Sequence, residues 1–579
     1  MKTLFLTLLL LVWAFAAKAQ FTYTTNAGTI VISGYTGSGG AVIVPSTVFG
    51  MQVVGIANNA FLNNTLVTSV TLPSSVTAIG DTAFQGCSSM SGVIIPQGVQ
   101  LIGQNAFNGC SQLGSVTVPS SVASLGQSAF SGCSKILSAS IGNGLNAIPQ
   151  YAFQNCGLTS VTIPSSVTSI GSYAFQGCSG LTSVTIPSSV TSMGKFTFYN
   201  CSGLTSVTVS GSVIDSSTFV GCSGLASVTI SSGVISGSCF GNSYMTSLII
   251  SNGVTSIGGS SAFINQYRLT RLTIPGSVTS IGSSAFQGCS GLTSLTISNG
   301  VTNIGNSAFQ NCGMTSVTIP SSVTSIGSSA FNGCSGLTSL TISNGVTSIG
   351  SSAFQNCGLT SVTIPSSVTS IGSAAFQGCS SNILVDANNT VYSSGGGVLF
   401  NKSQTMLIQC PVGIAGSYTI PSSVTNIGSS AFYGCSGLTS VTIPSSVTSI
   451  GSAAFQGCSG LTSVIFQGNA PTPNSDSSVF SGDTLATASY PAGKTGWTAT
   501  FDGISTAMQG VAPTPPALGI STYSGDLPTV FFPTATGTNF VLQMTTNLTS
   551  PNWVTVTNGV PFSGVEITNP PSNAFFRLQ

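Results

Sequence analysis

Residues 158–180 read LTSVTIPSSVTSIGSYAFQGCSG, and close copies of this string recur from about residue 59 to residue 466. Each copy carries a marker phenylalanine, and most successive markers are 22 or 23 residues apart. The markers are Phe61, Phe84, Phe107, Phe130, Phe153, Phe175, Phe198, Phe219, Phe240, Phe263, Phe286, Phe309, Phe331, Phe354, Phe376, Phe432 and Phe455. A period of this length is typical of a solenoid, because a single repeat buries its apolar face only by stacking on its neighbours. The sequence therefore predicts one elongated domain of about 17 coils.

Within one coil, the apolar residues Leu181, Val184 and Ile186 are spaced as in a short strand that turns alternate side chains inward. Pro187 should end this strand, since proline has no amide hydrogen for the next coil. No segment has a helical apolar period over ten residues. We expect a parallel sheet on one side of the coil and turns or short 3₁₀ pieces on the other. The glycine after the next Ile or Met, such as Gly194, should supply the positive φ of a tight corner.

The pattern I-P-S-S-V-T-S-I-G-x-x-A-F-x-x-C-x-x-L-T-S-V resembles the BspA-like leucine-rich repeats of bacterial surface proteins. The resemblance implies a mostly β leucine-rich-repeat solenoid with little or no α-helix outside a signal peptide. It also implies adhesion or protein binding at the cell exterior. Ser380 to Thr419 interrupts the repeats and is similar to the hairpin-bearing segment that such proteins insert.

The first 19 residues have the features of a secretory signal. Lys2 precedes an apolar run from Leu4 to Ala17, and Ala17-Lys18-Ala19 is a small-x-small cleavage motif. The alternative is a membrane anchor, although the run is shorter than the about 20 residues that a span needs. Cleavage after Ala19 would give a secreted or cell-surface protein without a membrane span in the mature chain.

The remaining segments are expected to cap or extend the solenoid, because stacked coils expose apolar core and strand edges at both ends. Short aromatic strands after a proline-rich linker predict a small β-sandwich-like module, which resembles a C-terminal module of some exported bacterial proteins. The expected organisation is a signal peptide (1–19), an N-terminal cap (20–58), repeats (59–379), an inserted hairpin-like segment (380–419), repeats (420–466), a C-terminal cap (467–508), a linker (509–518) and the β module (519–579).

Composition argues against several function classes. Only 3% of residues are charged, and nine basic side chains face eight acidic ones, so no basic patch for nucleic acid can form. The absence of histidine removes the usual general base and the commonest metal ligand. The few carboxylates are scattered, and C-x-x-C spacing is absent. We therefore expect no enzyme, metal or cofactor.

Sixteen cysteines in an exported chain raise the question of disulfides. Fourteen stand three residues after a marker phenylalanine, while Cys239 and Cys410 are out of register. Stacking places equivalent residues about 4.8 Å apart, so neighbours could pair. Uninterrupted runs of seven and five cysteines cannot pair completely, and Asn64, Ser243 and Gln266 fill the same position elsewhere. We expect mostly buried, reduced thiols. The structural ladder is represented by Phe286, Phe309, Phe331, Phe354, Cys289, Cys312, Cys334 and Cys357.

The outward residues of each strand should form two lanes of hydroxyls, such as Ser183 and Thr185. One irregular coil breaks this pattern: it carries Tyr267 and Arg268, and it has Arg271 where regular coils have serine. Tyr and Arg are common at interface hot spots, so Tyr267, Arg268, Arg271 and Thr273 are the candidate ligand-binding residues. The alternative is a drifted repeat without a role.

Together these features predict a non-catalytic adhesion or binding protein that presents a polar Ser/Thr-lined face to an extracellular protein or glycan. One alternative is a structural spacer for the C-terminal module. A more remote alternative is an ice-binding surface, because parallel coils repeat hydroxyls at regular spacing.

Overall fold

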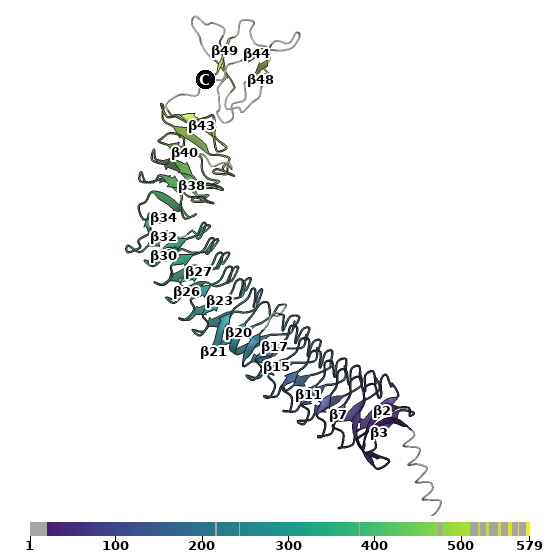
Figure 1. Cartoon of the computed structure of the whole chain (residues 1–579). Helices are drawn as coiled ribbons and strands as arrows, with labels where there is room; N and C mark the ends of the chain where they lie inside the picture. The colour runs from purple at the N-terminus through teal and green to yellow at the C-terminus, as the bar shows by residue number, and fades with distance from the viewer. Residues whose placement is uncertain are drawn as a thin grey trace, which may run out of the picture.

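The computed structural model describes residues 20–509 apart from 215–216, 242–243, 381 and 473–477, and beyond residue 509 only the backbone of six strands. The predicted signal peptide lies outside the described residues. The coils stack into an elongated, curved solenoid of about 20 turns (Figure 1). Every regular element in the described part is a β-strand, so the predicted mostly β leucine-rich-repeat fold is confirmed.

One column of strands, the long lane, follows the L-x-x-V-x-I part of each repeat. Its strands pair in parallel and in register, as Ser183 with Ser206 and Ile186 with Val209. Proline or a polar residue ends most strands. The long lane comprises β3 (Gly40–Ile43), β6 (Val67–Thr71), β8 (Gly92–Ile94), β10 (Ser115–Val118), β12 (Ser138–Ile141), β14 (Ser160–Val161), β16 (Ser183–Ile186), β18 (Ser206–Val209), β20 (Ser227–Ile235), β21 (Ser247–Ile257), β22 (Arg271–Ile274), β24 (Ser294–Ile297), β26 (Ser316–Ile319), β28 (Ser339–Ile342), β30 (Ser361–Ile364), β32 (Asn382–Val385), β36 (Gly416–Thr419), β38 (Leu438–Ile443), β40 (Ser463–Phe466), β41 (Thr487–Tyr490) and β43 (Ile504–Met508). The lane is divided into several separate sheets.

A second column, the short lane, was not predicted. It is built from the Ser-Ile pair before each corner glycine, where the isoleucine is buried and the serine lies outside, as in Ser169 and Ile170. β20 and β21 are long enough to reach both lanes, and β21 continues the short lane into the next coils. The other strands are β5 (Met51–Ile56), β7 (Ala78–Ile79), β9 (Leu101–Ile102), β11 (Ser124–Leu125), β13 (Ala147–Ile148), β15 (Ser169–Ile170), β17 (Ser192–Met193), β19 (Ser212–Ile214), β23 (Ser280–Ile281), β25 (Asn303–Ile304), β27 (Ser325–Ile326), β29 (Ser348–Ile349), β31 (Ser370–Ile371), β35 (Met406–Gln409), β37 (Asn426–Ile427) and β39 (Ser449–Ile450). The expectation of strands on only one side of the coil was therefore wrong.

The corner glycine also has a different role from the one predicted. Gly171 and Gly194 are not among the glycines with positive φ. A Cβ at Gly171 would lie 2.4 Å from the backbone nitrogen of Gln150 in the preceding coil. Glycine is needed there because two backbones come too close for a side chain. The positive φ falls instead two residues later, as at Tyr173 (60°), and at the glycine before the cysteine, as at Gly177 (71°).

The marker phenylalanines form a continuous column inside the solenoid. From Phe61 to Phe376 the neighbouring rings stack nearly parallel, with centroids 4.8–5.6 Å apart. The column restarts at Phe432 and continues through Phe455 to Phe480. Phe480, in the segment predicted as the C-terminal cap, contributes a further ring to the ladder.

The thiols form a second internal column, and all sixteen cysteines are buried and free of disulfides in the structure. Fourteen Sγ atoms lie 3.1–3.6 Å from a backbone carbonyl oxygen of the preceding coil, in most cases that of its marker phenylalanine. Burial raises the pKa of the Cys87 thiol to about 11 and that of Cys178 to about 12, which favours the protonated form that donates this hydrogen bond. We name this position, three residues after the marker, the donor slot.

The two cysteines that are out of register occupy other ladder positions. Phe219 donates its amide hydrogen to the carbonyl of Cys239, as marker amides elsewhere donate to the alanine before the next marker. Cys239 therefore takes an alanine position. Cys410 donates its amide hydrogen to Ala431 and so takes the marker position in a coil that lacks a phenylalanine.

Both ends of the described solenoid are covered by aromatic side chains. At the N-terminal end, β1 (Phe21–Asn26) and β2 (Thr29–Tyr35) form an antiparallel hairpin, and Tyr35 stacks on Phe61 with ring centroids 5.2 Å apart. β4 (Thr47–Val48) pairs with β5. At the other end, β42 (Thr500–Phe501) pairs with β43, and Trp497 packs edge-on against Phe466 at 4.6 Å. The ladder itself is closed by Tyr35 at Phe61 and by Phe501, which meets Phe480 edge-on with ring centroids 6.4 Å apart.

The inserted segment divides the hydrophobic core. β33 (Tyr392–Gly395) and β34 (Val398–Asn401) form an antiparallel hairpin, and β34 also pairs with β35. Leu399 belongs to the core of the long N-terminal block, whereas Val398 and Phe400 belong to the core of the short C-terminal block. Alternate side chains of one strand thus point into two separate cores.

Beyond residue 509, the described strands are antiparallel and form two three-stranded sheets. They are β44 (Gly519–Ser521), β45 (Thr529–Phe531), β46 (Leu542–Thr545), β47 (Val554–Thr557), β48 (Val565–Glu566) and β49 (Phe575–Leu578). The connections that would define the predicted β-sandwich, and nearly all of the predicted linker, lie outside the described residues.

Candidate functional site

The long lane presents hydroxyl groups to solvent. In β16, Ser183 and Thr185 are exposed while Val184 and Ile186 are buried, and both exposed residues pair with their counterparts in β18. The two rows of hydroxyl side chains do not run unbroken along the molecule, because the strands that carry them are divided into separate sheets. Thr229 is followed in the next coil by Ile249, which is 52% exposed. The breaks distinguish particular coils from the rest of the surface.

The irregular coil places its two candidate strand residues on this face. In β22, Arg271 and Thr273 are exposed and Leu272 and Ile274 are buried. Arg271 pairs with Ser294 of β24, so it stands in the serine position of the repeat. Its guanidinium therefore projects from a row of small hydroxyl side chains.

Tyr267 and Arg268 lie in the turn before β22 and contact a residue of the previous coil. The ring centroids of Tyr244 and Tyr267 are 5.4 Å apart, and the Arg268 guanidinium carbon lies 5.5 Å from the centroid of the Tyr244 ring. The pKa of Tyr267 is raised above its ordinary value, mainly by a hydrogen bond with the Tyr244 side chain. The positive charge of Arg268 opposes this effect but does not reverse it. We call Tyr244, Tyr267 and Arg268 the Tyr–Arg cluster. No described contact joins it to Arg271.

Tyr244 was missed by the sequence analysis, although its coil is also irregular, since it lacks the cysteine of the donor slot. Tyr244 and Tyr267 are 42% and 46% exposed, so the two rings and the guanidinium are accessible together. An exposed cation held against an aromatic ring can bind a carboxylate while the ring contacts an apolar group.

Gln266, next to Tyr267 in this turn, faces inward. It occupies the donor slot, is fully buried, and its Nε2 donates to the carbonyl of Phe240 at 3.2 Å. Its Oε1 accepts the amide hydrogen of Met245. Gln266 thus replaces the thiol donor and holds the turn that carries Tyr267 and Arg268.

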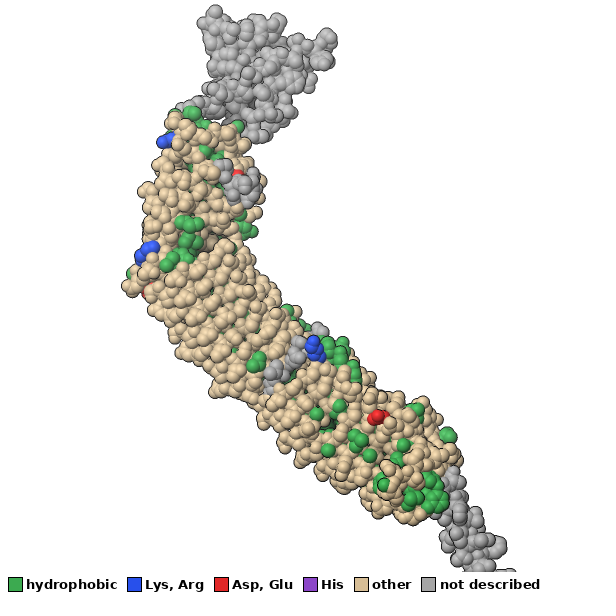
Figure 2. All heavy atoms as spheres, viewed as in Figure 1, with side chains coloured by type: hydrophobic (Ala, Val, Ile, Leu, Met, Phe, Trp, Pro, Cys, Tyr) green, Lys and Arg blue, Asp and Glu red, His purple; other side chains and the backbone are tan. Residues whose placement is uncertain are grey.

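Charge is scarce around these residues. Figure 2 shows a face dominated by uncharged polar side chains and backbone, with isolated basic and acidic groups. Hydrophobic side chains gather on this face of the solenoid near the inserted segment around β34. The inserted segment is therefore a second feature to consider as a site.

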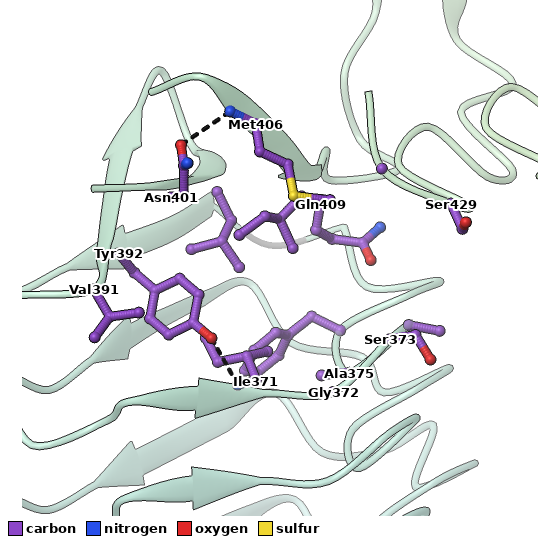
Figure 3. Close-up of a pocket in the computed structure, with 15 residues that line it drawn as sticks. Ile371, Gly372, Ser373, Ala375, Val391, Tyr392, Asn401, Met406, Gln409 and Ser429 are labelled. Atoms are coloured by element: carbon purple, nitrogen blue, oxygen red, sulfur yellow. Dashed lines mark hydrogen bonds between the residues drawn. The ribbon is translucent and has the colours of Figure 1, made fainter. Parts of the chain in front are cut away.

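A cavity of about 420 Å³ opens beside the inserted segment. Figure 3 shows Tyr392 and Met406 extending toward it from the hairpin side, with Ile371 and Ala375 of the preceding coil opposite. It lies where the phenylalanine column is interrupted, because Phe376 lines it and the next coil has Cys410 in the marker position.

The lining is mostly apolar and its polar groups are largely used within the protein. Tyr392 Oη accepts the amide hydrogen of Ile371 at 2.8 Å, and Asn401 Oδ1 accepts that of Met406 at 2.9 Å (Figure 3). Gln409 Nε2 donates to the carbonyl of Cys410 at 3.2 Å. A cavity of this size and lining suits a small apolar group with one polar end.

The stacked parallel coils, the internal phenylalanine column and the exposed polar lane define the class of the protein as a leucine-rich-repeat solenoid. The BspA type leucine-rich repeat region matches residues 54–165, 146–265, 258–383 and 415–498. The chain belongs to this family.

Three solved structures of similar chains come from bacteria. A leucine-rich repeat protein from Bacteroides ovatus is 26% identical, with 77% of this chain and 93% of that chain covered and a TM-score of 0.36. A leucine rich cell surface protein from Faecalibacterium prausnitzii is 23% identical, with 78% and 94% covered and a TM-score of 0.34. The pneumococcal vaccine antigen PcpA is 24% identical, with 41% and 74% covered and a TM-score of 0.35. No curated protein sequence matches the chain.

Proteins of this family are generally non-catalytic repeat proteins, and their fold is of a kind that binds other molecules. The described part of the chain contains no helix with the length and hydrophobicity of a membrane span.

Proposed function

We propose that the chain is an exported, non-catalytic binding protein of the cell exterior, and that the Tyr–Arg cluster with Arg271 holds an acidic group of an extracellular protein or glycan. The observation that carries this proposal is the Tyr–Arg cluster itself. Its accessible guanidinium rests on one of two exposed tyrosine rings, in a surface with few charges. The signal peptide predicted at 1–19 and the family's surface proteins support an exterior location.

The repeat supplies variants that remove the site without disturbing the fold. Regular coils have glycine in the position of Arg268 and serine in the position of Arg271, so Arg268→Gly and Arg271→Ser restore the consensus. Lys135 is exposed and stands in the same repeat position as Arg268. Lys135→Gly is therefore a control that removes one positive charge from the same place in another coil.

The test is a binding screen of the full chain against extracellular matrix proteins and acidic glycans, followed by affinity measurements on the three variants. If Arg271 is a hot spot, Arg271→Ser should weaken binding by about 2 kcal/mol, or about 30-fold in Kd. Arg268→Gly should act in the same direction, and Lys135→Gly should leave the affinity unchanged. Equal affinity of all variants, with unaltered melting temperatures, would make the irregular coil a drifted repeat.

The two alternatives make different predictions. A spacer would bind none of the probes, and substitutions in the coils would act only through stability. An ice-binding surface needs a long flat array of hydroxyls, and the division of the long lane into separate sheets together with the exposed Ile249 does not favour it.

A further inference from the structure

Three consecutive coils carry an aromatic residue on the outside of the solenoid. Tyr151, Tyr173 and Phe196 stand two residues before the marker phenylalanines, and they are half-buried rather than part of the core. The ring centroids of Tyr151 and Tyr173 are 5.2 Å apart, as are those of Tyr173 and Phe196, with interplanar angles of 13° and 15°. We call these three residues the aromatic row.

The backbone at these positions does not favour large side chains. Tyr151, Tyr173 and Phe196 have φ of 58°, 60° and 60°. This left-handed region is unfavourable for bulky residues and is better tolerated by small polar ones. Other coils have small residues there, namely Asn59, Thr82, Asn105, Ser128, Ser217, Ser261, Ser284, Ser307, Ser329, Ser352, Ala374, Ser430 and Ala453. The three aromatic residues are therefore an exception within the repeat, and the core does not require them.

A column of amides lies one turn further along the same coils. Gln154 and Gln176 follow their marker phenylalanines directly, and Gln154 Nε2 donates to Gln176 Oε1 at 2.8 Å. In the third coil Tyr199 takes the glutamine position, and its ring meets Phe196 edge-on with centroids 5.4 Å apart. Aromatic rings, amides and a phenol thus lie side by side over three coils.

The row ends abruptly on both sides. The next coils have Ser128 and Ser217 in its position, and among the described residues no further ring stacks on the outer faces of Tyr151 and Phe196. Between residues 136 and 214 the sequence has one charged side chain, Lys195. The surface therefore offers apolar ring faces and neutral hydrogen-bonding groups, and little to neutralise a charged ligand.

We propose that the aromatic row is a binding site for a neutral polysaccharide that crosses the solenoid, because rings stacked from coil to coil present their faces along the solenoid axis. The apolar face of a sugar ring stacks on the outer face of Tyr151 or of Phe196. Its hydroxyls exchange hydrogen bonds with the amides of Gln154 and Gln176 and with the phenol groups. A neutral, hydroxyl-rich ligand fits because aromatic side chains provide contact area while a few amides and hydroxyls fix orientation. This site is separate from the Tyr–Arg cluster and does not depend on it.

The test is affinity electrophoresis of the full chain in gels containing soluble β-1,3-glucan, hydroxyethylcellulose, xylan, mannan or dextran. The key variant combines Tyr151→Ser, Tyr173→Ser and Phe196→Ser, which restores the small residue of other coils and relieves the left-handed backbone. Tyr433 is 38% exposed and occupies a glutamine position outside the row, so Tyr433→Gln is the matched control for loss of an exposed ring.

We expect at least one of these polysaccharides to retard the wild-type chain. In the triple variant the Kd should rise about tenfold or more, with the melting temperature retained. Tyr433→Gln and Arg268→Gly should bind as the wild type does, and the second result separates this proposal from the proposed function. Three outcomes would overturn the proposal: no retardation of the wild type by any of the five, equal retardation of the triple variant, or binding that is lost with Arg268→Gly.

Discussion

Asp483 is expected to make the C-terminal end of the solenoid sensitive to pH. It stands in the donor slot of the coil of Phe480, where fourteen coils have a thiol and Gln266 has an amide that donates a hydrogen bond. Its side chain is 3% exposed, and neither carboxyl oxygen has a hydrogen-bond partner among the described residues. The nearest amides, of Gly457 and Cys458, already donate to Ser481 and Phe455. The protonated carboxyl of Asp483 can donate a hydrogen bond as the thiols and Gln266 do, whereas the carboxylate cannot.

The magnitude follows from the pKa. Burial raises the pKa of Asp483 to about 7, against about 3.9 in an unfolded chain. The difference corresponds to at most about 4 kcal/mol of unfolding free energy. Because the folded state binds the proton more tightly, it holds more protons than the unfolded chain between pH 4 and 7. The contribution of Asp483 to the unfolding free energy is therefore full below about pH 4. It decreases as the pH rises to about 7 and is lost above that value.

The assay is urea unfolding at several pH values between 4 and 8. It is followed by the fluorescence of Trp497 in a chain that starts at Gln20, and so lacks Trp13, and that carries Trp553→Phe. Asp483→Asn keeps the size of the side chain, provides a hydrogen-bond donor and does not titrate. It should therefore remove the decrease in unfolding free energy that the parent shows between pH 4 and 7. Asp81→Asn controls for the loss of one negative charge, since Asp81 is exposed and its Oδ1 accepts the amide hydrogen of Gln104. If the unfolding free energies of the parent and of Asp483→Asn change with pH in the same way, Asp483 is not the cause of the pH dependence.

Three further predictions concern the core. Phe331→Ala should cost about 3 to 5 kcal/mol in unfolding free energy, because the ring is fully buried and stacks on a phenylalanine 5.3 Å away on each side; a loss of about 1 kcal/mol or less in chemical denaturation would contradict this. Mass spectrometry after alkylation of the denatured, unreduced protein should count most of the sixteen cysteines as free thiols, and a majority in disulfides would show the prediction to be wrong. Gly171→Ala should lower stability by about 1 to 3 kcal/mol or more, because its Cβ would meet the Gln150 backbone nitrogen at 2.4 Å. A melting temperature equal to that of the parent would show that the coils can move apart there.

Much of the fold could be predicted because the same pattern of apolar residues recurs in nearly every coil. Leu181, Val184 and Ile186 identify the long lane by their spacing, and the position of Phe331 in every coil implies a ring column. The short lane could not be predicted in this way, because Ser169-Ile170 is too short to show a strand period. The role of Gly171 depends on the distance between coils, which the sequence alone does not contain.

The candidate site was predicted in part. Arg271 was identified because it departs from the repeat, and its position on an exposed strand follows from the alternation of Leu272 and Ile274. Tyr244 was missed because it is separated from Tyr267 by one coil, and only the stacking of coils brings the two rings together. The cavity beside Tyr392 was not predicted, since it arises where an insertion removes a ring from the core.

The division of the core at β34 has a mechanical consequence. Because stability in a stacked array comes from contacts between neighbouring coils, unfolding can stop where those contacts change. Val398 and Leu399 point into different cores, so the coils before and after the hairpin should unfold as separate cooperative units. When the C-terminal end is pulled against a ligand held at the proposed Tyr–Arg cluster or aromatic row, both units bear the same tension. The short unit can then unfold and extend while the coils of the long unit, which carry both proposed sites, stay folded.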